Sequence, residues 1–137
     1  SNTAMTASKQ SASDFLAKEI DSMDEEEERN ELLQLIKNYK QILSINSSNA
    51  NVKVKLADLY VKINDRDSAT NELREAAQIY LNKGELTPCI EACEKVLSYQ
   101  PTDQKSRLLL KQAINKRDAF KALESAIIFA DQTDEED

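Results

Sequence analysis

Two cysteines, Cys89 and Cys93, have the side chains with the widest chemistry, because thiols bind metals, form disulfides and act as nucleophiles. They lie four residues apart in a segment with helical apolar spacing, so both fall on one helix face. A zinc site would need more cysteines or partner histidines, and the chain has no histidine. We therefore predict two small apolar core residues and no metal, a cysteine usage that fits a reducing cytoplasm.

Carboxylates are plentiful, but their spacing does not predict catalysis. The run Asp24–Glu28 is consecutive, so its side chains point in different directions around a helix. No serine or cysteine stands beside a base, no glycine-rich loop could hold a phosphate, and a dimetal bundle would need Glu-x-x-His pairs. We predict a non-catalytic protein with no catalytic residue and no cofactor.

The elements that carry these residues are predicted to be helices. The 137 residues fit one domain, and 40% apolar residues suffice for a core. One glycine and two prolines leave few tight turns for a sheet, and apolar residues recur at spacings of three and four. The fold class is therefore all-α, and no apolar run approaches the ~18 residues of a membrane span.

Apolar periodicity and cap residues divide the chain into five to six helices. Gly84 stands where a helix C-terminus needs a left-handed residue. Thr87 is the N-cap of the next helix, with Pro88 in its first turn, and Asp103 caps another helix. The break near Asn115 is weak, so the last two helices could be continuous. The predicted ranges are 28–45, 50–63, 66–82, 87–99, 103–115 and 118–130.

The charge is distributed in three blocks. Residues 1–31 hold nine acids and three bases, and residues 131–137 hold five acids and no base. The whole chain carries −7, so residues 32–130 are left with +4. Blocks of like charge repel themselves. We predict three parts: a largely disordered arm over 1–30, with a vector remnant at 1–5 and spacing that would suit a short helix at 13–23; a helical domain over 31–130; and a disordered tail over 131–137.

The apolar skeleton repeats after a shift of 54 residues. Self-similarity at a fixed spacing indicates a helical repeat protein, in which stacked helices bury one another and leave an extended surface for a partner. The shift sets Leu32 on Leu86, Ile36 on Ile90, Tyr39 on Cys93, Ile42 on Val96, Leu43 on Leu97, Val54 on Leu108 and Leu56 on Leu110.

The residue order resembles the tetratricopeptide repeat over about residues 31–117. Lys53, Leu56-Ala57 and Tyr60 stand in the Trp, Leu-Gly and Tyr slots of that repeat, and Ala69 with Leu73 stands in its Ala-x3-aromatic slots. The Ala, aromatic and Pro slots of a later unit hold Cys89, Cys93 and Pro101, and those of an earlier unit hold Leu35, Tyr39 and Ser47. The Trp, Leu-Gly and Tyr slots of another first helix hold Arg107, Leu110-Lys111 and Ile114. The period is 54 rather than 34, a difference of 20, so the helix over 66–82 serves twice: as second helix of one unit and first helix of the next.

The resemblance implies a right-handed stack of antiparallel helix hairpins that binds a peptide or protein on its concave face. First helices line that face in the family. Carrying the slots over implies partner-binding residues Asn51, Val54, Asp58 and Lys62, followed by Lys105, Leu108 and Gln112. Some members of the family bind a partner's C-terminal carboxylate through a clamp of polar and basic residues. We do not predict this clamp here, because Lys105 is the one fitting residue among its slots.

A basic cluster follows Pro101, with Lys105, Arg107 and Lys111 at its start. It predicts an acidic or phosphorylated peptide as partner, although an ordinary solvated helix face would look the same. A third interpretation is that the cluster attracts the chain's own run Asp24–Glu28, weakly and in a salt-sensitive way.

The main alternative is self-association. The last predicted helix is too apolar for a terminal repeat helix, which predicts a homodimer surface at Phe120, Ile127, Ile128 and Phe129. Nucleic acid is not expected as a partner, because the chain is acidic and no aromatic side chain accompanies the basic cluster. The sequence as a whole predicts a scaffold or adaptor of a bacterial cytoplasm, acting away from the membrane.

Overall fold

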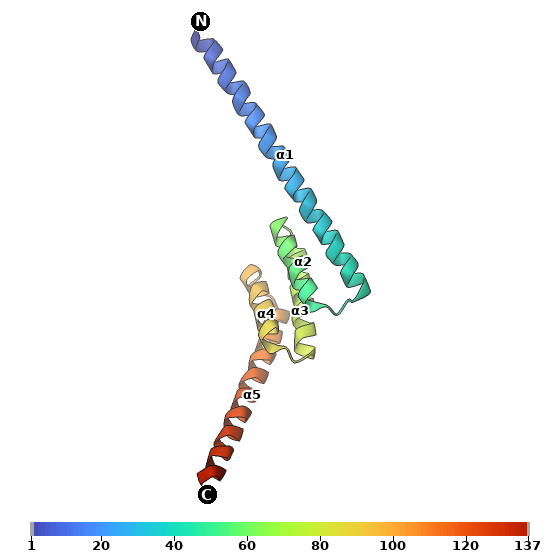
Figure 1. The fold of residues 1–137 in the computed structure, drawn as a ribbon, viewed down its shortest axis with the longest axis vertical. Coiled ribbons are helices and arrows are strands. Elements are labelled where there is room, and N and C mark those ends of the chain that lie inside the picture. The colour runs from blue at the N-terminus through green and yellow to red at the C-terminus, as the bar shows by residue number, and fades with distance from the viewer. Residues whose placement is uncertain (1, 137) are drawn as a thin grey trace.

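A computed structural model describes residues 2–136, and it describes the side-chain environments of residues 10–133. The described residues form five helices and no strand, so the predicted all-α class is confirmed. The helices are α1 (Asn2–Ile45), α2 (Ala50–Lys62), α3 (Arg66–Asn82), α4 (Leu86–Tyr99) and α5 (Gln104–Glu136) (Figure 1).

Consecutive helices run antiparallel and pack side by side along the chain. α3 packs against α5 as well as against its neighbours α2 and α4, so α3 is central to the stack. Small residues let these helices approach closely, since Ala69, Ala76 and Ala77 of α3 are fully buried. The packed core runs from Leu32 to Ile114 and confirms a stack of helical hairpins.

Two turns of the same type separate the central helices. Asn64 has φ 63° after α2 and Gly84 has φ 75° after α3, which is the left-handed conformation predicted for Gly84. The next residue in each turn donates its N–H to a tyrosine carbonyl at 2.8 Å, Asp65 to Tyr60 and Glu85 to Tyr80. The two turns are therefore equivalent, and they lie 20 residues apart.

Side chains cap three of the helices. The Asn49 side chain accepts from the N–H of Val52 at 3.1 Å and the Asp65 side chain accepts from the N–H of Ser68 at 3.1 Å. The Asp103 cap is confirmed, because its Oδ2 accepts from the N–H of Ser106 at 3.0 Å. The prediction that Thr87 caps the fourth helix is wrong. Glu85 is its N-cap, without a side-chain bond, because the left-handed turn ends at Gly84.

The two ends of the chain differ from the sequence-based picture. Instead of a largely disordered arm over 1–30 with a short helix at 13–23, α1 is one helix from Asn2 to Ile45. α5 likewise continues through Asn115 and through most of the predicted tail 131–137, so the last two predicted helices are one. The physical reason is local: no glycine or proline precedes Gly84, and strong helix formers such as Ala, Lys, Glu and Gln are frequent at both ends. Ser1 and Asp137 lie outside the described residues.

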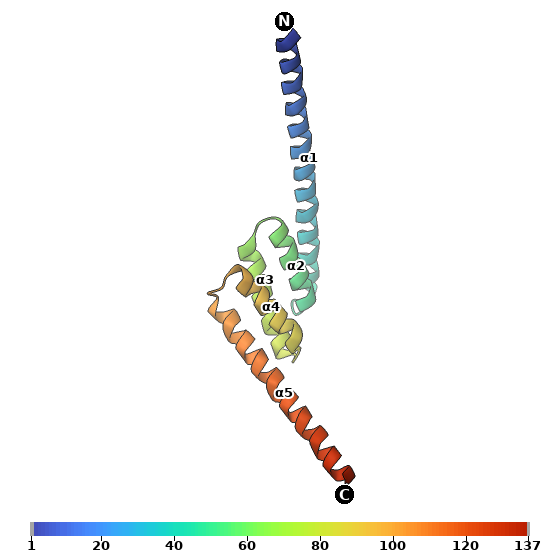
Figure 2. The same cartoon turned by 90° about the vertical axis from the view of Figure 1, so that its left-hand side faces the viewer.

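Both ends project from the stack in opposite directions. The N-terminal part of α1 leaves one end of the molecule and the C-terminal part of α5 leaves the other, as both views show (Figures 1 and 2). Every residue described from 10 to 31 is exposed, and so is every one from 118 to 133.

Candidate partner-binding site

Three of the four predicted partner-binding residues of α2 are exposed, and two of these three have partners within the molecule. Asn51 accepts a hydrogen bond at Oδ1 from the hydroxyl of Tyr80, and Val54 is half-buried against the core. Asp58 pairs with Lys95 of α4 at 3.1 Å. Lys62 lines an open groove together with the acidic side chains Glu25 and Glu28 of α1.

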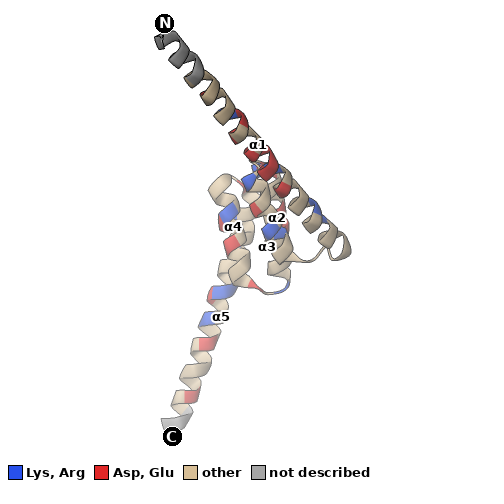
Figure 3. Cartoon of the chain, turned by 45° about the horizontal axis from the view of Figure 1, so that its top comes forward, with Lys and Arg blue, Asp and Glu red and all other residues tan. Residues whose placement is uncertain are grey.

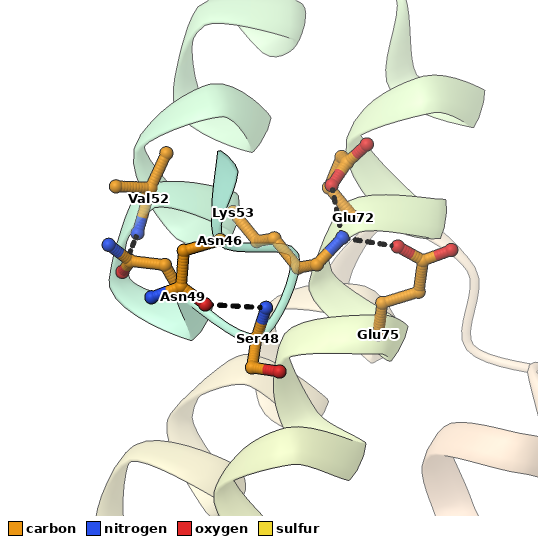
Figure 4. A network of polar contacts seen from close by, with 7 residues as sticks. All are labelled: Asn46, Ser48, Asn49, Val52, Lys53, Glu72 and Glu75. Carbon is orange, nitrogen blue, oxygen red and sulfur yellow. Dashed lines mark hydrogen bonds and ion pairs between the residues drawn. The ribbon is translucent and has the colours of Figure 1, made fainter. Parts of the chain in front are cut away.

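A lysine between α2 and α3 fixes these two helices together. Lys53 Nζ donates to Glu75 Oε2 at 2.6 Å and to Glu72 Oε2 at 3.4 Å (Figure 4). Burial lowers the pKa of Lys53, but the hydrogen bonds and charges of Glu75 and Glu72 outweigh it, so the pKa is raised overall. Lys53, which stands in the tryptophan slot of the repeat, thus joins two helices through charge instead of through an aromatic ring.

The predicted residues of α5 face a different helix. Gln112 lines a groove between α3 and α5, and the other α5 residues of this groove are Asn115 and Lys116. Lys105 lies one heptad before Gln112 and Leu108 one heptad before Asn115, so both share this side of α5. The α3 side of the groove is formed by Gln78, Leu81 and Asn82. We call this the α3–α5 groove.

The structure therefore does not bring the two halves of the predicted surface together. α2 and α5 are not among the helix pairs that pack on each other in the described part of the chain, whereas α3 and α5 are. Helices alternate between two layers in such a stack. The pair Asp58–Lys95 joins α2 to α4 in one layer, and α3 and α5 lie in the other. Because α2 and α5 are three helices apart, they fall in opposite layers.

An acidic residue positions α5 against α3. Asp103 Oδ1 accepts from Arg74 Nε at 3.1 Å, while Oδ2 caps α5. Burial alone would raise the pKa of Asp103, but its hydrogen bonds from Ser106 and the adjacent Arg74 hold that pKa below the usual value. Arg74 also donates to Asn71 at 2.7 Å, so Arg74 is oriented by α3 itself. This contact fixes the spacing of the two helices that form the groove.

The basic cluster of the sequence is divided between two faces. Lys105 lies on the side of the α3–α5 groove. Arg107 and Lys111 line a shallow pocket together with Leu110, Ile114 and Asn115, and this pocket meets the groove at Asn115. The acidic run of α1 lies far from this pocket, because Glu25 and Glu28 stand beside α2 (Figure 3).

The predicted dimer residues lie on the projecting part of α5. Phe120 is 64% exposed, Ile127 54%, Ile128 53% and Phe129 70%. Phe129 points to the other side of the helix from Phe120 and Ile127, because residues nine and two positions apart are out of phase in a helix. Leu123 shares the side of Phe120 and Ile127 and is 59% exposed, but it is not part of the dimer surface predicted from the sequence.

The two cysteines are buried in α4, as predicted. Both are free thiols with 0% exposure. Burial raises the pKa of Cys89, and it raises the pKa of Cys93 to about 12. Among the described residues, no group of three His, Cys, Asp or Glu side chains is placed to hold a metal ion.

Sequence reasoning missed the α3 side of the groove. Gln78 and Asn82 stand 20 residues after Asp58 and Lys62, which the sequence analysis predicts as partner-binding residues. The signal was present, because the 20-residue excess of the period already marked α3 as a first helix.

A comparison with protein families supports the same assignment. Residues 75–103 match the family model described as Tetratricopeptide repeat. The matched segment begins in α3, includes α4 and ends at Asp103, so it treats α3 as a first helix and α4 as a second.

No curated protein matched the chain. None of the described helices has an apolar stretch that could cross a membrane. Tetratricopeptide repeats generally mediate protein–protein contacts and are generally non-catalytic. With its matched unit and its stacked antiparallel helices, the chain is a tetratricopeptide-like helical repeat protein.

Proposed function

We propose that this protein is a non-catalytic scaffold that binds a peptide or protein segment along the α3–α5 groove. The observation that carries the proposal is the meeting of Gln78 and Asn82 with Gln112 and Asn115 along one groove. Side-chain amides both donate and accept hydrogen bonds, so they can pair with the N–H and C=O groups of an extended chain. The groove belongs to the stacked part of the chain, whose packed core runs from Leu32 to Ile114.

The charge of the groove favours an acidic segment. Lys116 lines the groove and Lys105 lies on the same side of α5, both with exposed side chains. No acidic side chain lines the groove itself. A carboxylate or phosphate near either lysine would gain a charge-assisted hydrogen bond, and binding would weaken as salt rises.

Capture from a lysate of the native cell tests the proposal, with the bound proteins identified by mass spectrometry. The groove variant carries Gln78→Ala and Gln112→Ala, and the matched control carries Lys55→Ala and Lys62→Ala on α2. We expect the groove variant to lose at least tenfold of the captured partner while the control keeps it. Equal capture by the two variants would refute the groove.

The acidic character of the partner is tested separately. Lys105→Glu should weaken capture, and Lys62→Glu, an exposed lysine of the opposite layer, should not. If raising the salt from 50 to 500 mM leaves capture by the wild type unchanged, the partner is not held by charge.

A second candidate function is self-association. It is favoured by the exposure of Phe120, Leu123 and Ile127 along one side of a projecting helix.

A further inference from the structure

Each projecting helix end carries an exposed apolar stripe. The α1 stripe consists of Phe15, Leu16, Ile20 and Met23, which are 57–67% exposed. The α5 stripe consists of Phe120, Leu123, Ile127 and Ile128, which are 53–64% exposed. Four large apolar side chains on one solvent-exposed stretch are more than a surface helix usually carries, so each stripe is a candidate contact surface.

The two stripes have the same spacing read in opposite directions. Successive members of the α1 stripe are one, four and three residues apart, and those of the α5 stripe are three, four and one residues apart. If the helices pack antiparallel, one register aligns all four pairs at once. In that register the opposed residues are Phe15 with Ile128, Leu16 with Ile127, Ile20 with Leu123, and Met23 with Phe120. Steps of three and four are those by which paired helices interlock side chains.

The two stripes of one chain cannot meet. The α1 end and the α5 end project from opposite ends of the stack (Figures 1 and 2). In addition, the α1 stripe is centred about 180° around the helix from Ile36 and Tyr39, which pack on the core, so it faces away from its own stack. The stripe that complements α1 therefore belongs to another molecule.

Charged residues stand at the base of each projecting end and are opposed in the same register. The run Asp24–Glu28 directly follows the α1 stripe, and Lys116, Arg117 and Lys121 border the start of the α5 stripe (Figure 3). The register places Glu27 opposite Lys116 and Glu26 opposite Arg117. It also places Glu19 opposite Glu124 and Glu25 opposite Asp118, so two like-charge pairs offset the two opposite-charge pairs and the apolar stripes supply the attraction.

We propose that two copies of this chain form a two-fold dimer in which α1 of each copy packs antiparallel on α5 of the other. The arrangement closes, because the same rotation that creates one helix pair creates the second. The two stacks then lie side by side, with one helix pair projecting at each end. Sixteen apolar side chains become covered, on the order of 1,500 Å² in total, which is the size of a stable interface.

This pairing explains both stripes, whereas pairing α5 with α5 covers one and leaves the α1 stripe in water. It specifies the partner segment of the self-association stated above and does not depend on the α3–α5 groove. The groove variants Gln78→Ala and Gln112→Ala touch neither stripe, so failure of one proposal is distinguishable from failure of the other.

Light scattering at about 20 μM tests the dimer. The chain has a mass of 15.5 kDa, and we expect the wild type at twice that mass. Ile20→Glu and Leu123→Glu should each give a monomer with unchanged circular dichroism. The control is Ile45→Glu on α1, since Ile45 is 90% exposed and outside the stripe. A wild type that remains monomeric overturns the proposal.

Single-cysteine cross-linking tests which helices pair. Cys89 and Cys93 are buried, so added surface cysteines are the reactive ones. Mixing Ile20→Cys with Leu123→Cys under mild oxidation should give a disulfide-linked dimer, while neither variant should cross-link alone. The out-of-phase control, Ile20→Cys mixed with Phe129→Cys, should give at most a tenth as much. Cross-linking of Leu123→Cys by itself would establish α5–α5 pairing and overturn the proposal.

Discussion

Arg74 of α3 and Asp103, the residue before α5, are joined at 3.1 Å, and this contact sets the two sides of the candidate groove. Both side chains are largely covered, with 24% of Arg74 and 13% of Asp103 exposed. Asp103 thus performs two tasks, because its other oxygen caps α5. The geometry of the groove depends on this one carboxylate.

Asp103→Ala should lower the free energy of unfolding by about 1–2 kcal/mol, because it removes a helix cap and leaves Arg74 without its carboxylate. Urea unfolding followed by circular dichroism measures the change. Thr102→Ala, at the exposed neighbouring residue, should change stability by less than about 0.5 kcal/mol. Similar losses in the two variants would contradict the role given to Asp103.

Stability should fall in acid partly through the same residue. The pKa of Asp103 is lowered in the folded protein, so its contribution is present above the unfolded value of 3.8 and is lost as the pH falls through the lower folded pKa. Melting temperatures between pH 2 and pH 7 should therefore decline less steeply below pH 4 for Asp103→Asn than for the wild type. Parallel curves would show that Asp103 is not preferentially ionised in the fold.

Lys53→Ala should destabilise the α2–α3 contact by about 1–2 kcal/mol, since it leaves Glu72 and Glu75 close together without their cation. The side chains of Lys53 and Glu72 are 12% and 20% exposed, whereas that of Glu75 is 59% exposed, so solvent weakens the shorter of the two ion pairs. Chemical denaturation measures the loss, with Lys55→Ala on the exposed side of α2 as control. A loss no greater than that of the control would mean that the ion pairs add nothing measurable.

Gly84→Ala should cost about 1–2 kcal/mol although there is room for a methyl group, because no atom lies within 4 Å of the added Cβ. The cost comes from the left-handed backbone, with φ 75°. The equivalent turn after α2 has Asn64 at φ 63°, where glycine is the favoured residue. Asn64→Gly should therefore leave the free energy of unfolding unchanged or raise it. A loss of stability in Asn64→Gly would argue against equivalence of the two turns.

Cys89 and Cys93 should resist alkylation at pH 8 in the folded protein. Burial raises the pKa of both thiols, so the reactive thiolate is scarce. Mass spectrometry after treatment with iodoacetamide should show modification only when denaturant is added. Rapid labelling without denaturant would show that α4 is not packed as described.

The sequence predicted local features well because their causes are local. The helix over 66–82 has those bounds in the structure, and Gly84 and Asp103 perform the tasks expected from their types. The continuity of α1 was not predicted, because the like charges of its acidic run favoured disorder, whereas for α5 the weak break near Asn115 had left one continuous helix open. Both effects are local: the helix propensity of these segments outweighs the repulsion between their like charges.

Which of the two layers of the stack a helix occupies was harder to predict. Two residues in equivalent slots of the repeat lie in the same layer only if an even number of helix steps separates them. Lys62 and Lys116 occupy equivalent positions 54 residues apart, but an odd number of helix steps separates them and places them on opposite sides. Counting helices, rather than residues, would have directed attention to Gln78 and Asn82.

Cross-linking across the groove tests the placement of α3 beside α5 most directly. Gln78→Cys combined with Gln112→Cys should form an intrachain link with a short thiol-reactive cross-linker, detected by peptide mapping. Asp58→Cys combined with Gln112→Cys should form none. A link in the second variant and none in the first would contradict the two-layer arrangement and the binding groove with it.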